Sequence, residues 1–461
     1  MNDTSIISHR RAAIIRIPFM RFTRINFLIL LSVFIGSVFM NGLSNAEQAE
    51  DIPYDRYSDT ASDEPASGAD PSPLRTLSRI PAIPLEILRT IIKKPLIFLE
   101  KYHFRQKGEH IVEFLHRNGI YPAFKGTGGG GAGPGAGVTL NAAELLKLPE
   151  PLADLGLYGW TSASINRYQY HGGGFNAVDL LWPGMYVSGD ISYRDYTEED
   201  FFGLGPDTSL GNGVTYRQLE TDYSIRAGNQ FTRTIRAEVE FSYRDIRIIN
   251  GRDDGKSQLK HIYASRPLNG LDGADFLSET LKLVHDTRDN RKDPHSGGYE
   301  TLSFSYNNAA GAPFEYFRYK ADIARFIPLF DDKGVLALRA AGEYHDSVGD
   351  AAAPFFTVSR LGGYETLPGY QYNRFYDDGA VFFNAEYRYN IWQWKEWDMD
   401  AVLGFASGQV FHRVNKIQMR DFRNSYSMGL RSIYKKNVMA CGQISLSDEG
   451  PELYLKFKAP F

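Results

Sequence analysis

Hydrophobic and polar residues alternate along much of the chain after about residue 119. In residues 235–243 the odd positions carry Ile, Ala, Val, Phe and Tyr, whereas the even positions carry Arg, Glu and Ser. Residues 317–323 and 383–391 show the same alternation of apolar and polar side chains. Successive side chains of a β-strand point to opposite faces of the sheet. The pattern therefore predicts two-faced strands, and we count about 16 of them over residues 119–461.

The alternation alone does not decide which face meets water. A soluble sandwich packs its apolar face inward, whereas an outer-membrane barrel turns that face to lipid and lines its lumen with polar side chains. The predicted connections favour the barrel, because short turns such as residues 435–437 alternate with long loops at 199–212, 250–276 and 347–378. Short turns at one end and long loops at the other are typical of outer-membrane barrels.

The C-terminal segment supports the same interpretation. Leu453, Leu455, Phe457, Ala459 and Phe461 occupy alternate positions, and the last of them is an aromatic carboxy-terminal residue. The segment resembles the recognition strand by which the barrel-assembly machinery selects outer-membrane proteins during biogenesis. We therefore predict an all-β fold, a transmembrane antiparallel β-barrel over residues 119–461 that is surrounded by outer-membrane lipid. An open sheet edge in lipid would leave backbone groups unpaired, so the sheet is expected to close.

The N-terminus carries an export signal. Two arginines precede an apolar run over residues 27–40, and residues 44–46 (Ser-Asn-Ala) offer small side chains at a cleavage site. This order predicts a secretory signal peptide over residues 1–46. A membrane anchor would need about 18–20 apolar residues, which is more than this run contains. Met20 stands where such a peptide should begin, so the true start is expected there, and the mature chain is expected to begin at Glu47.

Two segments separate the export signal from the strands. Residues 47–73 are acidic and rich in Pro and Ser, which predicts a disordered linker. Residues 74–118 carry apolar side chains at helical spacings, interrupted by Pro95 and Gly108. They are expected to form two or three short amphipathic helices, in the periplasm or as a plug in the barrel mouth. These helices are also the candidate contact for a periplasmic partner.

The composition argues against several other classes of protein. The formal net charge is −4, so no basic face for nucleic acid is expected. Cys441 is the only cysteine, which makes an intrachain disulfide impossible. The ten histidines show no metal-ligand spacing, and the glycine-rich residues 128–137 lack the Gly-Lys-Ser/Thr of a phosphate loop. We therefore expect no cofactor, no metal site and no enzymatic activity.

Several landmarks, in chain order, resemble the BamA/TamA superfamily of outer-membrane barrels, the bacterial surface antigen family. Residues 286–297 resemble the family's turn motif, and residues 361–391 resemble its sixth loop and the strand that follows it. The turn motif comprises Asp286, Arg288, Asp289, Pro294 and Gly297, and the loop motif comprises Gly362, Gly363, Leu367, Pro368, Gly369, Tyr370 and Arg374. The resemblance covers about residues 120–461 and implies a barrel in the bacterial outer membrane.

Two positions depart from the family's loop motif. The family has an arginine where this chain has Pro368, and the acidic partner of that arginine corresponds to Ala406. The loss of one member of such a pair leaves the other charge buried without a partner. The loss of both can be nearly neutral for stability. The resemblance makes Glu386 the second acidic partner in the lumen, and Arg374 is the expected substitute cation. The three glycines of the loop predict that residues 361–378 fold into the lumen.

The segment before the barrel also departs from the family. Residues 74–118 are too short and too helical for the POTRA domains with which family members receive client chains. Three functions remain open at this stage. The protein aids the insertion, export or maintenance of outer-membrane components, or it is a passive channel or transporter, or it is a structural barrel that binds a periplasmic partner.

Overall fold

The computed structural model describes residues 114–123, 132–133, 135–149, 152–252, 257–265, 268–329, 333–348 and 351–456. All of these belong to one compact unit, Asp59–Phe461. The predicted signal peptide, the linker and residues 74–113 of the predicted helical segment lie outside the described residues. Phe457 and Phe461 of the predicted recognition strand lie outside them as well.

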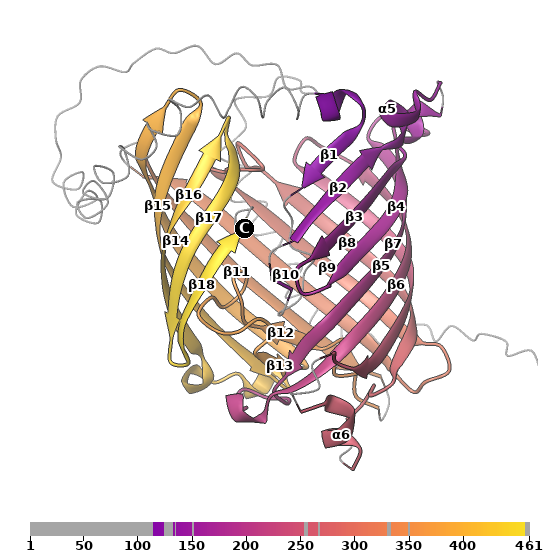
Figure 1. Cartoon of the computed structure of the whole chain (residues 1–461), viewed down its shortest axis with the longest axis vertical. Helices are drawn as coiled ribbons and strands as arrows, with labels where there is room; N and C mark the ends of the chain where they lie inside the picture. The colour runs from indigo at the N-terminus through magenta and orange to yellow at the C-terminus, as the bar shows by residue number, and fades with distance from the viewer. Residues whose placement is uncertain are drawn as a thin grey trace, which may run out of the picture. The chain divides into compact units, whose positions relative to one another are not determined.

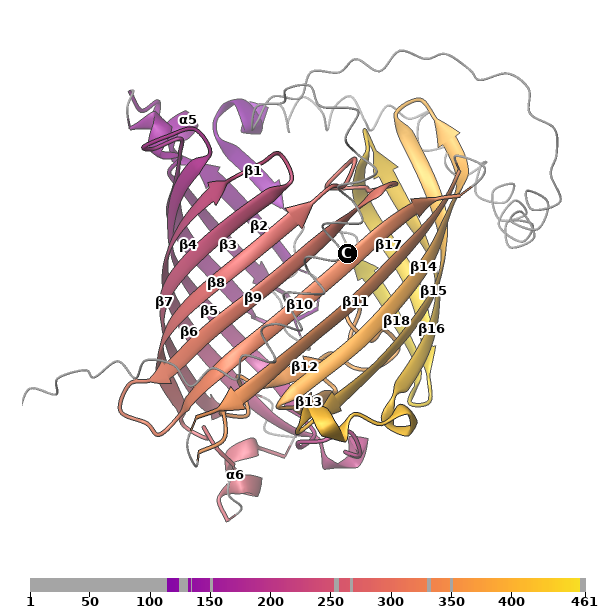
Figure 2. The same cartoon turned by 180° about the vertical axis from the view of Figure 1, so that it is seen from behind.

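Among the described residues, sixteen strands form one sheet in which each strand pairs with its neighbour along the chain, except that β11 is followed by β14. The sheet curves into the wall seen in Figures 1 and 2. The predicted all-β barrel fold and the predicted number of strands are confirmed. The strands are β1 (Ile120–Ala123), β2 (Gly135–Asn141), β3 (Tyr158–Ser164), β4 (Gln169–Val178), β5 (Met185–Phe201), β6 (Val214–Gln230), β7 (Ile235–Asn250), β8 (Gly273–Asp286), β9 (Gly297–Ala309), β10 (Glu315–Pro328), β11 (Gly334–Ser347), β14 (Gly379–Trp394), β15 (Trp397–Phe411), β16 (Arg423–Tyr434), β17 (Asn437–Ser447) and β18 (Gly450–Lys456).

The two faces of the sheet differ in chemistry, as the alternation predicts. Apolar side chains such as Phe241 on β7 and Phe383 on β14 are about half exposed on the outer face. The inner face carries charged side chains in pairs. Arg226 on β6 lies 3.0 Å from Asp190 on β5, and Arg339 on β11 lies 2.6 Å from Asp322 on β10. Charges on the inner wall are thus largely neutralised by neighbours on adjacent strands.

The two ends of the wall differ in their connections. The turns 231–234, 395–396 and 435–436 lie at one end, called here the short-turn end. The loops 202–213, 251–272 and 348–378 lie at the other, called the long-loop end. The long-loop end also carries the helix α6 (Leu259–Tyr263) and the 3₁₀ turns η3 (Leu210–Asn212), η4 (Val414–Lys416) and η5 (Met419–Asp421), whereas α5 (Ala142–Leu146) and η2 (Ala153–Leu155) lie between β2 and β3 at the short-turn end. Among the described helices, none is long and apolar enough to cross a membrane.

The first and last strands of the sheet are short. β1 has four residues and β18 has seven, whereas β5 and β6 have 17 each. The pairings found among the described residues run from β1 to β18 and include none between these two strands. The junction between β18 and β1 is called the seam below. Over the described residues it is the part of the wall with the fewest strand residues.

A separate two-stranded sheet lies within the curve of the large one (Figures 1 and 2). It pairs β12 (Ser359–Leu361) with β13 (Phe375–Asp377) in antiparallel register. Both strands belong to the long loop between β11 and β14, so the fold itself brings this loop inside the wall.

Candidate functional site: the inward loop and its clasp

The loop between β12 and β13 is held in a tight path by glycine. Gly362, Gly363 and Gly369 all have positive φ, with Gly362 at +122°. A Cβ at Gly362 would lie 2.2 Å from the Gln371 carbonyl oxygen, so no other residue fits there without a backbone shift. The loop therefore turns back on itself inside the wall, in the direction that the glycine positions predict.

The loop tip packs against the inner wall through apolar contacts. Leu367 and Tyr370 are buried in one cluster with residues of β11, β14 and β15. Ala406 belongs to this cluster and is 2% exposed. Pro368 is buried beside Leu367. Where the family pattern has an ion pair between loop and wall, this chain has an apolar contact, so neither missing charge leaves an unpaired partner behind.

Hydrogen bonds fix the loop to the last strands. The Gly369 N–H donates to the Tyr454 hydroxyl at 3.1 Å, and that hydroxyl donates to the Tyr370 carbonyl at 3.2 Å. The Ser447 hydroxyl donates to the Gly369 carbonyl at 2.5 Å. These contacts connect the loop tip to β17 and β18, the two strands on one side of the seam.

Arg374 is the most buried cation of the loop, with its side chain 2% exposed. Its guanidinium lies 2.7 Å from Glu449, in the turn between β17 and β18. The same group donates to the Thr208 hydroxyl at 2.8 Å and the Thr208 carbonyl at 2.5 Å. Arg374 thus joins the hairpin before the seam to the β5–β6 loop beyond it.

The expected pair between Arg374 and Glu386 is not formed. Glu386 faces the lumen, but it accepts from Arg388 two residues along the same strand, at 3.0 Å. Arg374 lies at the base of the loop near the long-loop end, where Glu449 and Thr208 reach it from two different loops. The sequence-based choice of partner was wrong because residues at i and i+2 of a strand share a face, which gives Glu386 a closer cation.

Arg423, at the start of β16, makes a second connection of the same kind. Its guanidinium donates to the Pro206 carbonyl at 3.2 Å and lies 3.2 Å from Asp448 and 3.7 Å from Asp207. We call Arg374, Arg423 and their partners in residues 206–208 and 448–449 the clasp. The clasp spans the seam at the long-loop end, from the β17–β18 turn to the β5–β6 loop.

The turn motif at the short-turn end is built by its acidic side chains. Asp286 accepts two hydrogen bonds at 2.9 Å from the Arg288 guanidinium. One carboxylate oxygen of Asp289 accepts the backbone N–H groups of His295 and Ser296. Gly297 has φ +85°, and a Cβ there would lie 2.0 Å from the Thr287 carbonyl oxygen. Both aspartates therefore shape the turn, as expected of turn caps.

The same turn reaches across to the far side of the sheet. Asp293 and Arg431 on β16 form a buried ion pair, and Asn290 donates to the Lys436 carbonyl at 3.2 Å. Pro294 is buried next to Asp293. Burial opposes ionisation of Asp293, but the hydrogen bond from His295 and the charge of Arg431 outweigh it and lower the pKa of Asp293 to about 2.

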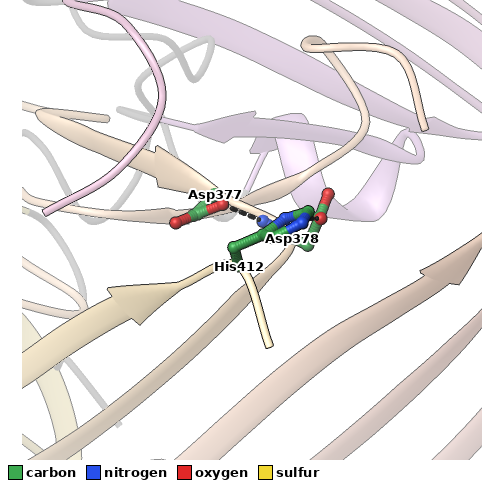
Figure 3. A group of neighbouring side chains, drawn as sticks. All are labelled: Asp377, Asp378 and His412. Carbon is green, nitrogen blue, oxygen red and sulfur yellow. Dashed lines mark hydrogen bonds and ion pairs between the residues drawn. The ribbon is translucent and has the colours of Figure 1, made fainter. Parts of the chain in front are cut away.

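A group of metal-ligating side chains lies at the base of the inward loop (Figure 3). Asp377 ends β13, Asp378 follows it, and His412 follows β15. Ligand atoms of the three lie within 4.8 Å of one another, and His412 Nδ1 lies 2.5 Å from Asp378. Burial raises the pKa of Asp377 to about 6. The histidine spacing along the chain predicted no such group, because strand pairing alone brings His412 to the two aspartates.

Of the predicted recognition strand, Leu453 and Leu455 belong to the described residues, whereas Phe457 and Phe461 do not. Leu453 and Leu455 of the recognition strand point outward from β18 and are largely exposed. The residues that sequence reasoning missed include Thr208, Glu449, Asp293 and Arg431. Each contacts its partner over a long sequence separation, so only the arrangement of the strands reveals them.

Comparison with known proteins identifies relatives of this barrel. The model of the Omp85 superfamily domain matches residues 160–434. Among solved structures, BamA from Haemophilus ducreyi lacking POTRA domains 1–3 is similar with a TM-score of 0.53 at 14% identity, covering 73% of this chain and 69% of that one. CdiB from Escherichia coli gives a TM-score of 0.46 at 13% identity over 72% of this chain and 60% of that one. No curated protein matches the sequence.

Proposed function

Because this chain belongs to the Omp85 superfamily and lies in the bacterial outer membrane, we propose that it aids the insertion, export or maintenance of outer-membrane components. It does so as a non-enzymatic barrel whose seam opens sideways to lipid. The surrounding lipid is one partner, and the barrel-assembly machinery is another during biogenesis.

The observation that carries this proposal is the construction of the seam. Over the described residues its two edge strands are short, with four residues in β1 and seven in β18. Among the described residues no backbone pairing joins β1 to β18. The clasp supplies the contacts across it instead, through side chains of Arg374 and Arg423. Side-chain contacts of this kind are exchanged more readily than a full strand pairing.

A passive channel is the second candidate, and the charged inner wall favours it. Two features oppose steady conduction. The inward loop packs its apolar tip on the inner wall, and the 286–297 turn reaches across to Arg431. We therefore expect only a small steady conductance in a planar bilayer, whereas a large one would favour the channel.

The experiment that tests the proposal combines depletion of this protein from cells with a chemical cross-link across the seam. Asp207→Cys with Asp448→Cys places thiols on opposite sides of the seam, at side chains that are 87% and 57% exposed. A short bis-maleimide added to intact cells would join them, while the native Cys441 is buried. Depletion should alter the outer-membrane inventory of proteins and lipids. The double variant should restore that inventory until the bis-maleimide is added.

The matched control keeps the cross-link on one side of the seam. Asp448→Cys with Arg420→Cys joins the β17–β18 turn to the neighbouring loop before β16, where Arg420 is 79% exposed. This variant should remain functional after cross-linking. An unchanged inventory after depletion would contradict the proposed function, and equal effects of both cross-links would contradict the opening of the seam.

A further inference from the structure

The Asp377 carboxylate is buried in an unusual way. The residue is 6% exposed, and its carboxylate accepts the Asp378 N–H at 2.9 Å. The positive charge that acts on this carboxylate is that of His412, whose own contact is with Asp378. A buried carboxylate is costly unless a cation or several donors compensate it. One N–H donor and a histidine that is already paired with Asp378 compensate this charge only in part, so the position favours an added cation.

The neighbouring side chains complete a set of metal ligands. Asp378 contributes a second carboxylate, and His412 contributes an imidazole. Imidazole nitrogen together with carboxylate oxygen suits Zn²⁺, which takes three protein ligands and a water in its open sites. We propose that Asp377, Asp378 and His412 bind one Zn²⁺ ion at the long-loop end of the barrel.

The geometry requires only a small rearrangement. Zn–N and Zn–O bonds of about 2.0–2.2 Å place tetrahedral ligands roughly 3.3 Å apart. The ligand atoms here lie within 4.8 Å of one another. His412 is 64% exposed, so its ring has room to turn once its contact with Asp378 is released. The ion would replace the direct contact between His412 and Asp378.

The position of the site gives the ion a mechanical role. Asp377 and Asp378 stand where the inward loop rejoins the wall at β14, and His412 stands at the end of β15. The Asp378 carbonyl already accepts the backbone N–H of His345 on β11 at 2.8 Å. A bound ion would therefore fasten the base of the inward loop to two neighbouring wall strands.

The test is a titration of the folded chain in detergent, purified without a histidine tag and stripped with chelator. Calorimetry with Zn²⁺ should show one saturable site per chain, and Zn²⁺ should raise the unfolding temperature. His412→Gln and Asp377→Asn should each weaken binding at least about tenfold. The controls His261→Gln and Asp346→Asn replace an exposed histidine and an exposed aspartate outside the group, and they should bind as the parent does.

Because His412 is largely exposed, its replacement can change Zn²⁺ binding without affecting the folding of the barrel. Because its side chain is largely exposed, His412→Gln should fold and migrate on gels as the parent does. The tetrahedral absorption of Co²⁺ bound in place of Zn²⁺ gives a second measurement, and it should vanish in His412→Gln. Saturable binding that survives in His412→Gln would overturn the proposal, as would the absence of saturable Zn²⁺ binding in the parent.

Discussion

At the scale of single residues, Pro368 and Ala406 show how a buried ion pair is lost without damage. Both are buried, and Ala406 shares an apolar cluster with Leu367 and Tyr370. The sequence predicted that the two charges had been lost together. The loop glycines predicted that the loop folds into the lumen, but the sequence could not predict which side chains hold it there, because that depends on how Leu367 and Tyr370 fill the space.

Restoring one charge at this contact should destabilise the barrel. Ala406→Asp would bury an unpaired carboxylate among apolar side chains, at a cost of about 3–5 kcal/mol. Ala406→Asn, which has nearly the same shape without the charge, should cost less. Adding Pro368→Arg to Ala406→Asp should recover part of the loss. Urea unfolding of the detergent-folded variants measures all four proteins, and equal losses for Asp and Asn would show that the charge is irrelevant.

The partner of Arg374 can be tested by charge reversal. Arg374→Glu places two carboxylates together with Glu449 and should destabilise the barrel by roughly 3 kcal/mol, since the pair is mostly buried. Adding Glu449→Arg should restore part of the stability. Adding Glu386→Arg should restore none, because Glu386 is paired with Arg388. Rescue by Glu386→Arg, and not by Glu449→Arg, would contradict the contacts described for the clasp.

At the scale of elements, the 286–297 turn shows which parts of a motif are local. Asp286, Asp289 and Gly297 shape the turn through contacts within about ten residues, so the sequence predicted their role as turn residues. The pairing of Asp293 with Arg431 joins segments that are adjacent only when the barrel is assembled. No periodicity in either segment indicates that contact.

The Asp293–Arg431 pair should make stability depend on acid pH. The pKa of Asp293 is about 2 in the folded chain, below its ordinary value of 3.8. The unfolded chain therefore takes up the proton first as the pH falls. The contribution of Asp293 is complete above about pH 5, and it is lost as the pH falls through 4 towards 2. It amounts to roughly 2 kcal/mol at neutral pH.

The comparison of the parent with Asp293→Asn isolates this contribution from other carboxylates. Asp293→Asn should be less stable at pH 7 and should lose less stability between pH 5 and pH 2. The stability loss of His295→Gln, which removes one donor to Asp293, should lie between those of the parent and Asp293→Asn. Parallel stability curves for parent and Asp293→Asn across that range would exclude Asp293 as the titrating group.

At the scale of the whole molecule, the fold was predictable because its signals are local. Alternation marks each strand, and loop lengths mark the two ends, so the number of strands and the asymmetry of the barrel follow from short stretches of sequence. The clasp and the Zn²⁺ ligands were not predictable, since they depend on which loops meet over a short part of the wall. Local sequence patterns thus predict the barrel fold, whereas the site depends on contacts between loops that are distant in sequence.

The last strand should matter for assembly in the cell more than for stability. Leu453 and Leu455 face outward from β18, and the same alternation continues in the sequence to Phe461. If this alternation is what the assembly machinery recognises, deletion of Phe461 should abolish the folded barrel in the outer membrane. The same variant refolded in detergent should still resist heat-induced unfolding on gels, because β18 keeps its seven pairs with β17. Lys458→Gln, at a position of the opposite parity, should assemble normally. Normal assembly of the Phe461 deletion in cells would show that the recognition signal lies elsewhere in the chain.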